Sequence, residues 1–521
     1  MTSAESMTVP NVVSTQRDPK RWLILVVLCL STLVLVIDNM LLTVAIPQIS
    51  TDLGATAQDI QWTIDAYILV FAGLLLTTGS LSDRFGRRRV MVLGLVLFGL
   101  ASALAATAGS PEMLIAGRVV MGIGGALIMP STLSILITVF DEQERPKAIA
   151  AWSAAAMIGM VGGPVVGGVL LNHFWWGSAF LVNVPVVLLA IIAALTLMPE
   201  SKGPWTKPDY IGMILSIIGT TAVVWTIIEF PHSGIAGVWP GLVIGVLGMI
   251  AFAIRELNTE HPMVPLHLFG NKVFTGSSFS LVLVTFANGG LLLILTQYMQ
   301  FVLGYSPIKT ALAFTPMALS ALVFNALGAA MMVKVGVRPL TMVGMVVLAG
   351  GFAMLSVLSA DSGFWAPAIG MALVGAGAGL TIPTATNALM GAVPPEQAGI
   401  GSALNDTIQQ TGAAMGVAVL GAVLAGRYTG SMPESVSEAA RKNIASAVGG
   451  GEGTVIAAAR SAFTDAMSTT FSVGTASVLF ATVVAFFLMR GAQASQPVPE
   501  ATAAAVPDPD EADIPATSDL S

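Results

Sequence analysis

Long apolar runs recur along the whole chain, and short polar segments separate them. A membrane-spanning helix needs about 20 apolar residues, so each run predicts one transmembrane helix. Residues 1–21 are polar, and no cleavage-like segment follows the first run, so we expect a retained helix rather than a signal peptide. We predict fourteen spans, at residues 22–47, 61–80, 89–108, 113–138, 148–171, 177–198, 209–229, 239–254, 273–298, 308–333, 339–358, 364–390, 399–426 and 467–489.

The composition supports a membrane protein. Of the 521 residues, 55% are hydrophobic and 10% are charged, whereas a soluble globular chain is about 25% charged. No single soluble core could bury so much apolar surface, so lipid must surround many segments. The single cysteine, Cys29, excludes disulfides within the chain and cysteine-based metal sites, and four scattered histidines argue against a zinc centre. We expect no metal, no cofactor and no nucleic-acid partner.

Lysine and arginine are distributed unevenly between alternate connecting segments. If the N-terminus is cytoplasmic, sixteen of the 22 basic residues fall in cytoplasmic segments. Basic residues are enriched on the cytoplasmic side of membranes, so we expect both termini in the cytoplasm and an even number of spans. The tail at 490–521 is rich in alanine, proline and acids, and we predict that it is disordered.

A faint internal repeat divides the chain. The stretch MGIGGALIMPS at 121–131 is similar to VGAGAGLTIPT at 374–384, and LSDRFGRRR at 81–89 has a decayed partner at 332–340. Two similar halves around a central site are the layout of an alternating-access transporter. The predicted domains are a cytoplasmic segment at 1–21, a six-helix half at 22–198, two additional helices with linkers at 199–272, a second six-helix half at 273–489 with an extracellular loop at 427–464, and the tail at 490–521.

The stretch GSLSDRFGRRR, residues 79–89, connects the second and third predicted spans. Gly79 would allow another helix to approach closely, and Gly86 permits a tight turn. Asp83 can accept hydrogen bonds from a helix N-terminus or from Arg87. The alternative is that Arg84 and its basic neighbours only fix the membrane topology. The spacing is more specific than topology requires, so we predict a conformational motif.

A second candidate motif is GMVGGPVVGG at 159–168. Gly159, Gly163 and Gly167 are four residues apart and share one helix face, which suits close helix packing. Pro164 removes a backbone donor and bends the helix. We predict that this motif, which ends at Gly168, is a hinge or seal between the halves; a generic packing face is the alternative.

Two charged residues interrupt the apolar runs of the first half. An ionised acid at the membrane centre costs about 2.5–3.5 kcal/mol, so the presence of Asp38 suggests function. Burial favours the neutral form of a carboxyl group, which lets it exchange protons near neutral pH. Arg118 stays charged and must face an acid or a water-filled cavity, unless it is a structural residue near a helix end. We predict that Asp38, Asp406 and Arg118 couple proton movement to transport.

Asp406 lies in GSALNDTIQQTGAAMG at 401–416. Helical spacing places Ser402, Gln409 and Gln410 on the same face, so this face lines an aqueous path or a protein interface rather than lipid. A structural hydrogen bond within a helix contact is the alternative for Asp406.

These motifs resemble the major facilitator superfamily and, more narrowly, its fourteen-span drug:proton antiporter branch. The stretch DNMLLTVAIPQI at 38–49 resembles the first-helix signature of that branch, QWTIDAYIL at 61–69 is similar to its second-helix opening, and FLVNVPV at 180–186 also matches. The motif at 159–168 resembles one held to mark antiporters. The resemblance implies an all-α integral membrane fold with two pseudo-symmetric six-helix halves and two extra helices.

The resemblance also suggests where substrate binds. Asp65 resembles an acid of the subgroup that exports quaternary ammonium compounds and dyes, and relatives carry acids at the level of Asp406. Asp65 could instead be simply hydrated near its helix end, and Asn288 could equally make a helix–helix hydrogen bond. The predicted substrate-binding residues are Trp62, Asp65, Tyr67, Asn288, Asn405 and Gln409.

We therefore expect a monomeric, proton-coupled antiporter of the bacterial plasma membrane that exports hydrophobic cationic drugs or dyes. A dedicated exporter of one antibiotic, metabolite or lipid precursor is the alternative. A receptor or scaffold that has lost transport is a third class, but the retained Asp38, Arg118 and glycine motif argue against it. No nucleotide-binding loop or nucleophile–base pair is visible in the sequence, which argues against an enzyme and against ATP as the energy source.

Overall fold

The computed structural model describes residues 19–489, except 56, 204–208, 260, 261, 263, 265, 443 and 451. Most of the predicted N-terminal segment and the whole tail predicted to be disordered lie outside the described residues. Every regular element in the described part is helical, which confirms the all-α class.

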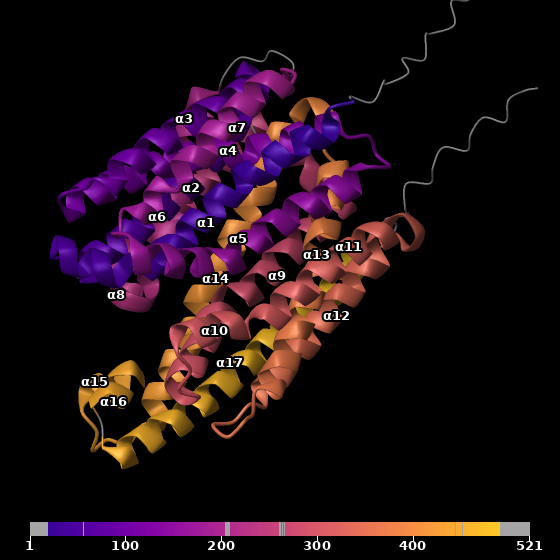
Figure 1. Ribbon diagram of the computed structural model, residues 1–521. Helices are drawn as coiled ribbons and strands as arrows, with labels where there is room; N and C mark the ends of the chain where they lie inside the picture. Colours follow the sequence, from indigo (N-terminus) through magenta and orange to yellow (C-terminus); the bar gives the residue numbers. More distant parts are fainter. Residues whose placement is uncertain are drawn as a thin grey trace, which may run out of the picture.

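The elements appear in Figure 1, in chain order, as α1 (Arg21–Leu53), α2 (Ala57–Phe85), α3 (Arg87–Ala106), α4 (Pro111–Val139), α5 (Arg145–His173), α6 (Ser178–Leu181), α7 (Asn183–Leu197), α8 (Tyr210–Asn258), η1 (Leu266–Gly270), α9 (Lys272–Gln297), η2 (Tyr298–Val302), α10 (Pro307–Ala313), α11 (Thr315–Val335), α12 (Val337–Ser356), α13 (Trp365–Gly391), η3 (Pro395–Gln397), α14 (Ala398–Ser431), α15 (Glu438–Lys442), α16 (Ile444–Gly450) and α17 (Gly453–Leu488).

The number of spans agrees with the prediction of fourteen. Within the described residues, 13 helices are long and apolar enough to cross a membrane, and the bent pair 145–160 and 165–173 brings the number to 14. Two spans lie in α8, at 210–227 and 233–258, and the chain reverses between them at Gly234, whose φ is +60°. The second of these extends beyond the predicted 239–254 at both ends, and Pro240 lies within the helix, as membrane helices tolerate.

The repeat seen in the sequence is also present in the structure. The first half is α1–α7 and the second half is α9–α17. Gly86 separates α2 from α3 with a φ of +110°, and Gly336 separates α11 from α12 with a φ of +88°. A Cβ at Gly94 would lie 2.8 Å from the Gly124 carbonyl oxygen, and the same close approach recurs between Gly344 and Gly377, at 3.0 Å. The duplicated motifs therefore adopt the same turn and the same helix packing.

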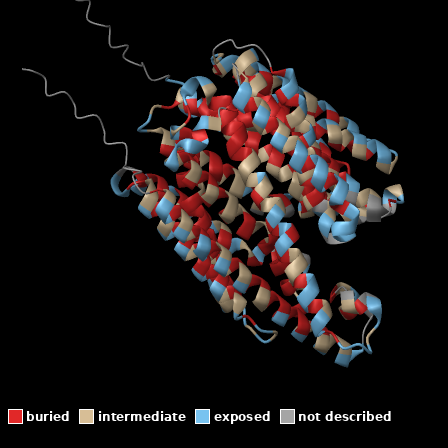
Figure 2. Ribbon diagram, turned by 180° about the vertical axis from the view of Figure 1, so that it is seen from behind, coloured by how far each residue is buried: buried red, intermediate tan, exposed pale blue. Residues whose placement is uncertain are grey.

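The two halves meet at the end of the bundle near the described termini, and they diverge toward the end where α15 and α16 lie (Figure 1). Helix α14 packs against α2 and α4, and α5 packs against α11 and α13. The apolar core of the first half continues into the second through Leu389, Ile400 and Ala403. Exposed residues lie mainly on the outward surfaces (Figure 2). There they include apolar side chains such as Leu188 and Ile192 on α7, as expected for a surface solvated by lipid.

A proline inside α4 receives support from a neighbouring helix. Pro130 has no N–H, so the Ala126 carbonyl one turn earlier loses its helical partner. The Thr78 hydroxyl of α2 donates to this carbonyl at 2.7 Å. The freed acceptor is therefore satisfied within the buried α2–α4 contact, as the cost of an unpaired buried carbonyl requires.

Candidate functional site

The structure joins the two charged residues of the first half in a buried ion pair. Asp38 lies in α1 and Arg118 in α4, and Arg118 Nη1 donates to Asp38 Oδ2 at 2.6 Å. Both side chains are fully buried. Removing one partner of such a pair would leave an uncompensated charge, which typically costs about 3–5 kcal/mol. The pair therefore fixes the relative positions of α1 and α4 as well as placing an acid inside the half.

Three further groups hold the Arg118 guanidinium. Its Nε donates to the carbonyl oxygen of Thr63 at 3.1 Å, and its Nη2 donates to Asn39 Oδ1 at 3.0 Å. The Tyr67 ring lies under the guanidinium, with 4.2 Å between Cζ and the ring centroid, which adds a cation–π contact. Tyr67 is buried and stacks on Phe71. In this conformation Tyr67 supports Arg118, and its predicted role in substrate binding stays a prediction.

The second oxygen of Asp38 is held by a residue that sequence reasoning did not select. Asn183, the first residue of α7, donates through Nδ2 to Asp38 Oδ1 at 2.7 Å. The same nitrogen donates to Ser102 Oγ of α3 at 3.1 Å, and Ser102 donates to the Phe180 carbonyl of α6 at 2.8 Å. The sequence pointed to this residue through the stretch FLVNVPV at 180–186, which matches a family motif. That match did not assign a role to Asn183.

Asp406 is also buried, but its surroundings differ from those of Asp38. Its Oδ1 accepts from Asn405 Nδ2 at 3.1 Å, and Asn405 Oδ1 accepts from Thr386 at 3.2 Å. Within the described residues, Asp406 Oδ2 and the Ser402 hydroxyl have no hydrogen-bond partner. In the part of the chain that the structure describes, no ion pair involves Asp406, so its Oδ2 is an acceptor available to a proton or a cationic ligand.

The two acids lie at different depths. Asp38 is 17 residues past the start of α1 at Arg21, about 25 Å along the helix, and Asp406 is 8 residues past the start of α14 at Ala398, about 12 Å. Both helices start at the end of the bundle where the halves meet. Asp38 and Asp406 therefore do not form one common site. Any coupling between the two acids must be transmitted by the residues that lie between them.

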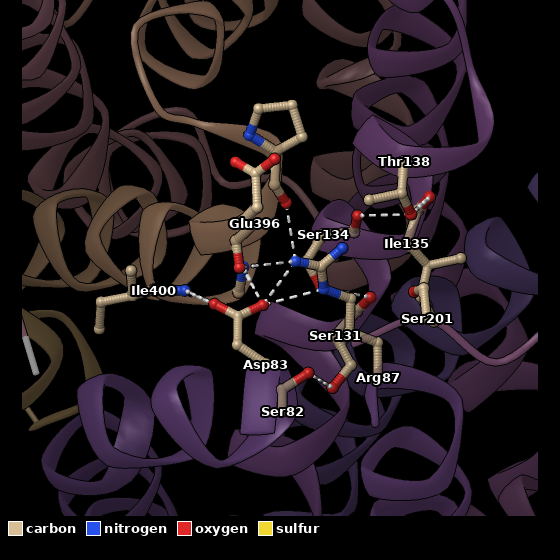
Figure 3. A network of polar contacts seen from close by, with 12 residues as sticks. Ser82, Asp83, Arg87, Ser131, Ser134, Ile135, Thr138, Ser201, Glu396 and Ile400 are labelled. Atoms are coloured by element: carbon tan, nitrogen blue, oxygen red, sulfur yellow. Dashed lines mark hydrogen bonds and ion pairs between the residues drawn. The ribbon is translucent and has the colours of Figure 1, made fainter. Parts of the chain in front are cut away.

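At that end, Asp83 joins the two halves (Figure 3). Its carboxylate accepts from Arg87 Nε at 2.9 Å and Nη2 at 2.7 Å, and it accepts the backbone N–H groups of Gly399 at 2.8 Å and Ile400 at 3.1 Å. Those N–H groups belong to the first turn of α14, so the carboxylate caps a helix N-terminus of the other half, where negative charge is favoured.

Arg87 crosses the same boundary. Its Nη2 donates to the carbonyl oxygens of Pro395 at 2.9 Å and Glu396 at 3.3 Å, and its side chain is buried. We call the contacts of Asp83 and Arg87 with residues 395–400 the Asp83 network.

The other residues of this motif pack around the Asp83 network. A Cβ at Gly79 would lie 2.4 Å from the Ala403 Cβ, so only glycine permits this approach of α2 to α14. At Gly86, the φ of +110° favours glycine, and the Glu200 carboxylate lies where a Cβ would stand. The Arg84 guanidinium lies over the Phe85 ring at 5.4 Å. These placements agree with a motif that positions helices, and they are more than is needed if the basic residues only fixed the topology.

The glycine motif of α5 lies against α1 of its own half. Cβ atoms at Gly159 and Gly163 would lie 3.1 Å from Val36 and 2.4 Å from Met40, and Gly167 faces the same helix. A Cβ at Gly168 would meet open space. The helix bends by 42° between its segments 145–160 and 165–173, and Pro164 lies in the break. The glycine face is thus a contact within the first half, and its predicted service as a seal between the halves stays a prediction.

The remaining predicted substrate residues differ in their surroundings, and their role in substrate binding stays a prediction. Trp62 is exposed at the start of its helix, and Asp65 and Gln409 are half-buried. Asn288 donates to the Val284 carbonyl of its own helix at 2.9 Å. The described residues contain no cluster of three histidine, cysteine or acidic side chains that could hold a metal ion.

Comparison with known proteins identifies the fold and the family. Residues 28–417 match the Major Facilitator Superfamily. The chain is 33% identical to the multidrug efflux pump LfrA of Mycolicibacterium smegmatis, over 84% of this chain and 88% of the pump. It is 32% identical to the methyl viologen resistance protein SmvA of Salmonella typhimurium, over 79% and 84%. It is 35% identical to the puromycin resistance protein of Streptomyces alboniger, over 78% and 83%.

Solved structures agree at the level of the fold. The human organic anion transporter MFSD10 superposes with a TM-score of 0.60 at 16% identity, covering 88% of this chain and 100% of that one. The proton:xylose symporter XylE also gives a TM-score of 0.60, at 14% identity, covering 92% and 97%. The chain is therefore a multi-pass membrane protein that belongs to the Major Facilitator Superfamily, and the relatives it resembles are named for drug efflux and antibiotic resistance.

Proposed function

We propose that the chain is a proton-coupled antiporter that exports hydrophobic, cationic drugs or dyes from the bacterial cytoplasm. The observation that carries this proposal is the buried Asp38–Arg118 pair. Burial favours the neutral form of the carboxyl group and the adjacent cation favours the ionised form, and these opposing effects let the acid exchange a proton. The names of the relatives support drugs as the class of substrate. One of them is named for resistance to methyl viologen, an organic cation.

Asp38 and Asp406 have separate tasks in this mechanism. A proton that reaches Asp38 neutralises the carboxylate and weakens its hold on Arg118. Asp406 has an acceptor without a partner and no adjacent cation, so it attracts a lipophilic cation when ionised and releases it when protonated. Each proton that enters down the membrane potential contributes about 2.3 kcal/mol per 100 mV, which drives export.

The orientation follows from the distribution of basic residues. We infer that both termini and the Asp83 network face the cytoplasm, so the conformation described here is closed on the cytoplasmic side. The apolar core that continues across the two halves at this end supports the inference. We propose that the exporter works as a monomer, because its two halves pack against each other through a shared apolar core.

A dedicated exporter of one antibiotic is the second candidate. Its support is that some relatives are named for a single compound, among them the puromycin resistance protein and a tetracenomycin C resistance and export protein of Streptomyces glaucescens. The same Asp38–Arg118 pair would serve it. A narrow substrate range in the transport assay below would favour this candidate.

The test is substrate-induced proton movement in proteoliposomes, measured with several cationic dyes and neutral drugs, with and without an uncoupler. Asp38→Asn is expected to abolish export driven by a pH gradient, and Asp406→Asn to reduce export of cations more than export of neutral compounds. Asp361→Asn, in an exposed turn, is the matched control. Normal dye export by Asp38→Asn under a pH gradient would show that Asp38 is not the coupling acid, and equal losses for both compound classes would contradict charge recognition by Asp406.

A further inference from the structure

An apolar groove lies on the outward surface of the second half, between α12 and α17, which pack against each other. It has a volume of about 350 Å³, and it is lined by Met342, Thr482, Val483, Phe486 and Phe487. Val483 and Phe487 are more than half exposed. The Thr482 hydroxyl donates to the Val478 carbonyl of its own helix at 2.8 Å, so its hydrogen is not available to a ligand. We call this site the α12–α17 groove.

The apolar surface continues from the groove toward the middle of the membrane. Val346 lies one turn beyond Met342 on α12, and Leu479 lies one turn before Val483 on α17. Both Val346 and Leu479 are exposed. From Arg338 to Val346 is eight residues, about 12 Å along the helix. A flexible hydrocarbon chain can follow such a surface and cover it.

Arg338 lies at the end of the groove that is nearest the described termini, one turn before Met342 on α12. Its Nη2 donates to the Phe486 carbonyl at 3.1 Å, and its Cζ lies 4.3 Å from the centroid of the Phe486 ring. Phe486 is in the last turn of α17, where carbonyl groups lack helical donors. The guanidinium is therefore held at the mouth of the groove, whereas a snorkelling arginine would extend its charged group into water.

The charge at this end of the groove is positive. Residues 331–342 and 480–490 contain three basic residues, Lys334, Arg338 and Arg490, and no acid. In the part of the chain that the structure describes, no ion pair involves Arg338. A guanidinium has five N–H donors, and the described contacts of Arg338 use one of them. Phosphate oxygens are strong acceptors for arginine, and the excess of positive charge favours a ligand with net negative charge.

We propose that the α12–α17 groove binds a phospholipid with an anionic headgroup, such as phosphatidylglycerol. The headgroup phosphate contacts Arg338, and one acyl chain lies in the groove. A cation at the membrane surface above an apolar furrow between two helices matches the charge and the shape of such a lipid, and basic sites between helices on the cytoplasmic side bind anionic headgroups. This lipid site does not depend on which compound the protein exports.

Native mass spectrometry of the purified, full-length protein tests the proposal with phosphatidylglycerol and phosphatidylcholine of equal chain length. The unsubstituted protein is expected to bind the first phosphatidylglycerol about fivefold more tightly than phosphatidylcholine, which is the contribution of one basic residue near an anionic lipid surface. Arg338→Gln should abolish this preference, and Arg338→Lys, which keeps the charge, should retain it. Met342→Trp fills the groove and should weaken the binding of both lipids.

Lys147→Gln is the matched control, because Lys147 is an exposed cation at the start of α5, at the same end of the bundle in the first half. Its replacement should change neither affinity. Equal affinities for the two lipids in the unsubstituted protein, or an unchanged preference in folded Arg338→Gln, would overturn the proposal. Met342→Trp keeps the test decisive if Arg338→Gln does not fold, because unchanged binding of both lipids by Met342→Trp would equally contradict the groove as the site.

Two rival occupants give different results. If inorganic phosphate displaces phosphatidylglycerol while Met342→Trp binds both lipids normally, Arg338 binds an anion from solution and the lipid site is wrong. The second rival is the tail at 490–521, which contains six acids. If the unsubstituted protein shows no preference, and a preference for phosphatidylglycerol emerges when these six acids are replaced by their amides, the tail occupies the site and the proposal fails.

Discussion

The Asp83 network is the polar connection between the halves at one end of the bundle, and replacing Asp83 by Asn should open that end. Asn keeps one carbonyl oxygen but presents an NH₂ group where the second carboxylate oxygen was. Asp83 accepts Gly399 N–H on one oxygen and Ile400 N–H on the other, so one N–H of α14 must lose its acceptor. The ion pair with Arg87 lies within one half and contributes little to the difference between open and closed states.

The size of the effect follows from these contacts. A hydrogen bond to a charged group contributes about 1.5–3 kcal/mol, and a negative charge at a helix N-terminus adds about 0.3–1 kcal/mol. The closed state should therefore lose about 2–4 kcal/mol relative to the open state. At 1.36 kcal/mol per tenfold change, this is a shift of roughly 30- to 900-fold in the equilibrium between the two states.

Distance measurement between two spin labels can detect this shift. Cys29 is the single cysteine, so Cys29→Ala gives a background for labels at Arg89 and Lys334, which are exposed in the first and second half. Asp83→Asn should add a population at longer distance. Glu396→Gln makes the same charge change in the same region, but the carboxylate of Glu396 points away from Asp83 (Figure 3). If Asp83→Asn and Glu396→Gln give the same distances as the labelled parent, the Asp83 network does not hold this end closed.

Two predictions concern stability, measured as thermal unfolding in detergent. Thr78→Val removes the donor to the Ala126 carbonyl and should cost about 1–3 kcal/mol, whereas Thr77→Val removes a buried hydroxyl without a partner and should be neutral or stabilising; equal losses would contradict the role given to Thr78. Gly163→Ala places a methyl group 2.4 Å from an α1 side chain and should cost about 1–3 kcal/mol through overpacking, whereas Gly162→Ala enters open space and should have little effect. An unaffected Gly163→Ala would show that α1 and α5 can separate at no cost.

The spans and the repeat could be predicted from the sequence because each depends on local patterns. Run length predicts the number of helices, and the glycines at 86 and 336 lie at the duplicated turns. The break in α8 at Gly234 was also visible as the boundary between two apolar runs. The exact extent of that second span was wrong because the helix continues at its C-terminal end through polar residues such as Arg255 and Asn258, which an apolar pattern leaves out.

The site could be predicted less completely, because contacts between helices depend on register and rotation. The sequence predicted that Arg118 must face an acid or water, but it could not choose Asp38, which is 80 positions away along the chain. Asn183 is a neutral residue at the start of a helix, which is a common position for asparagine. Only its hydrogen bond to Asp38 shows that it holds this carboxylate. The separate depths of Asp38 and Asp406 likewise follow from where α1 and α14 begin.

The second half repeats the glycine turn at Gly336 but has Val333 at the position that corresponds to Asp83. The duplicated turn therefore carries an acid in the first half and an apolar residue in the second. If Asp83 holds this end closed, the second half offers no carboxylate at the equivalent position to replace it. The two halves share the same turn, but the carboxylate that contacts the opposite half belongs to the first half.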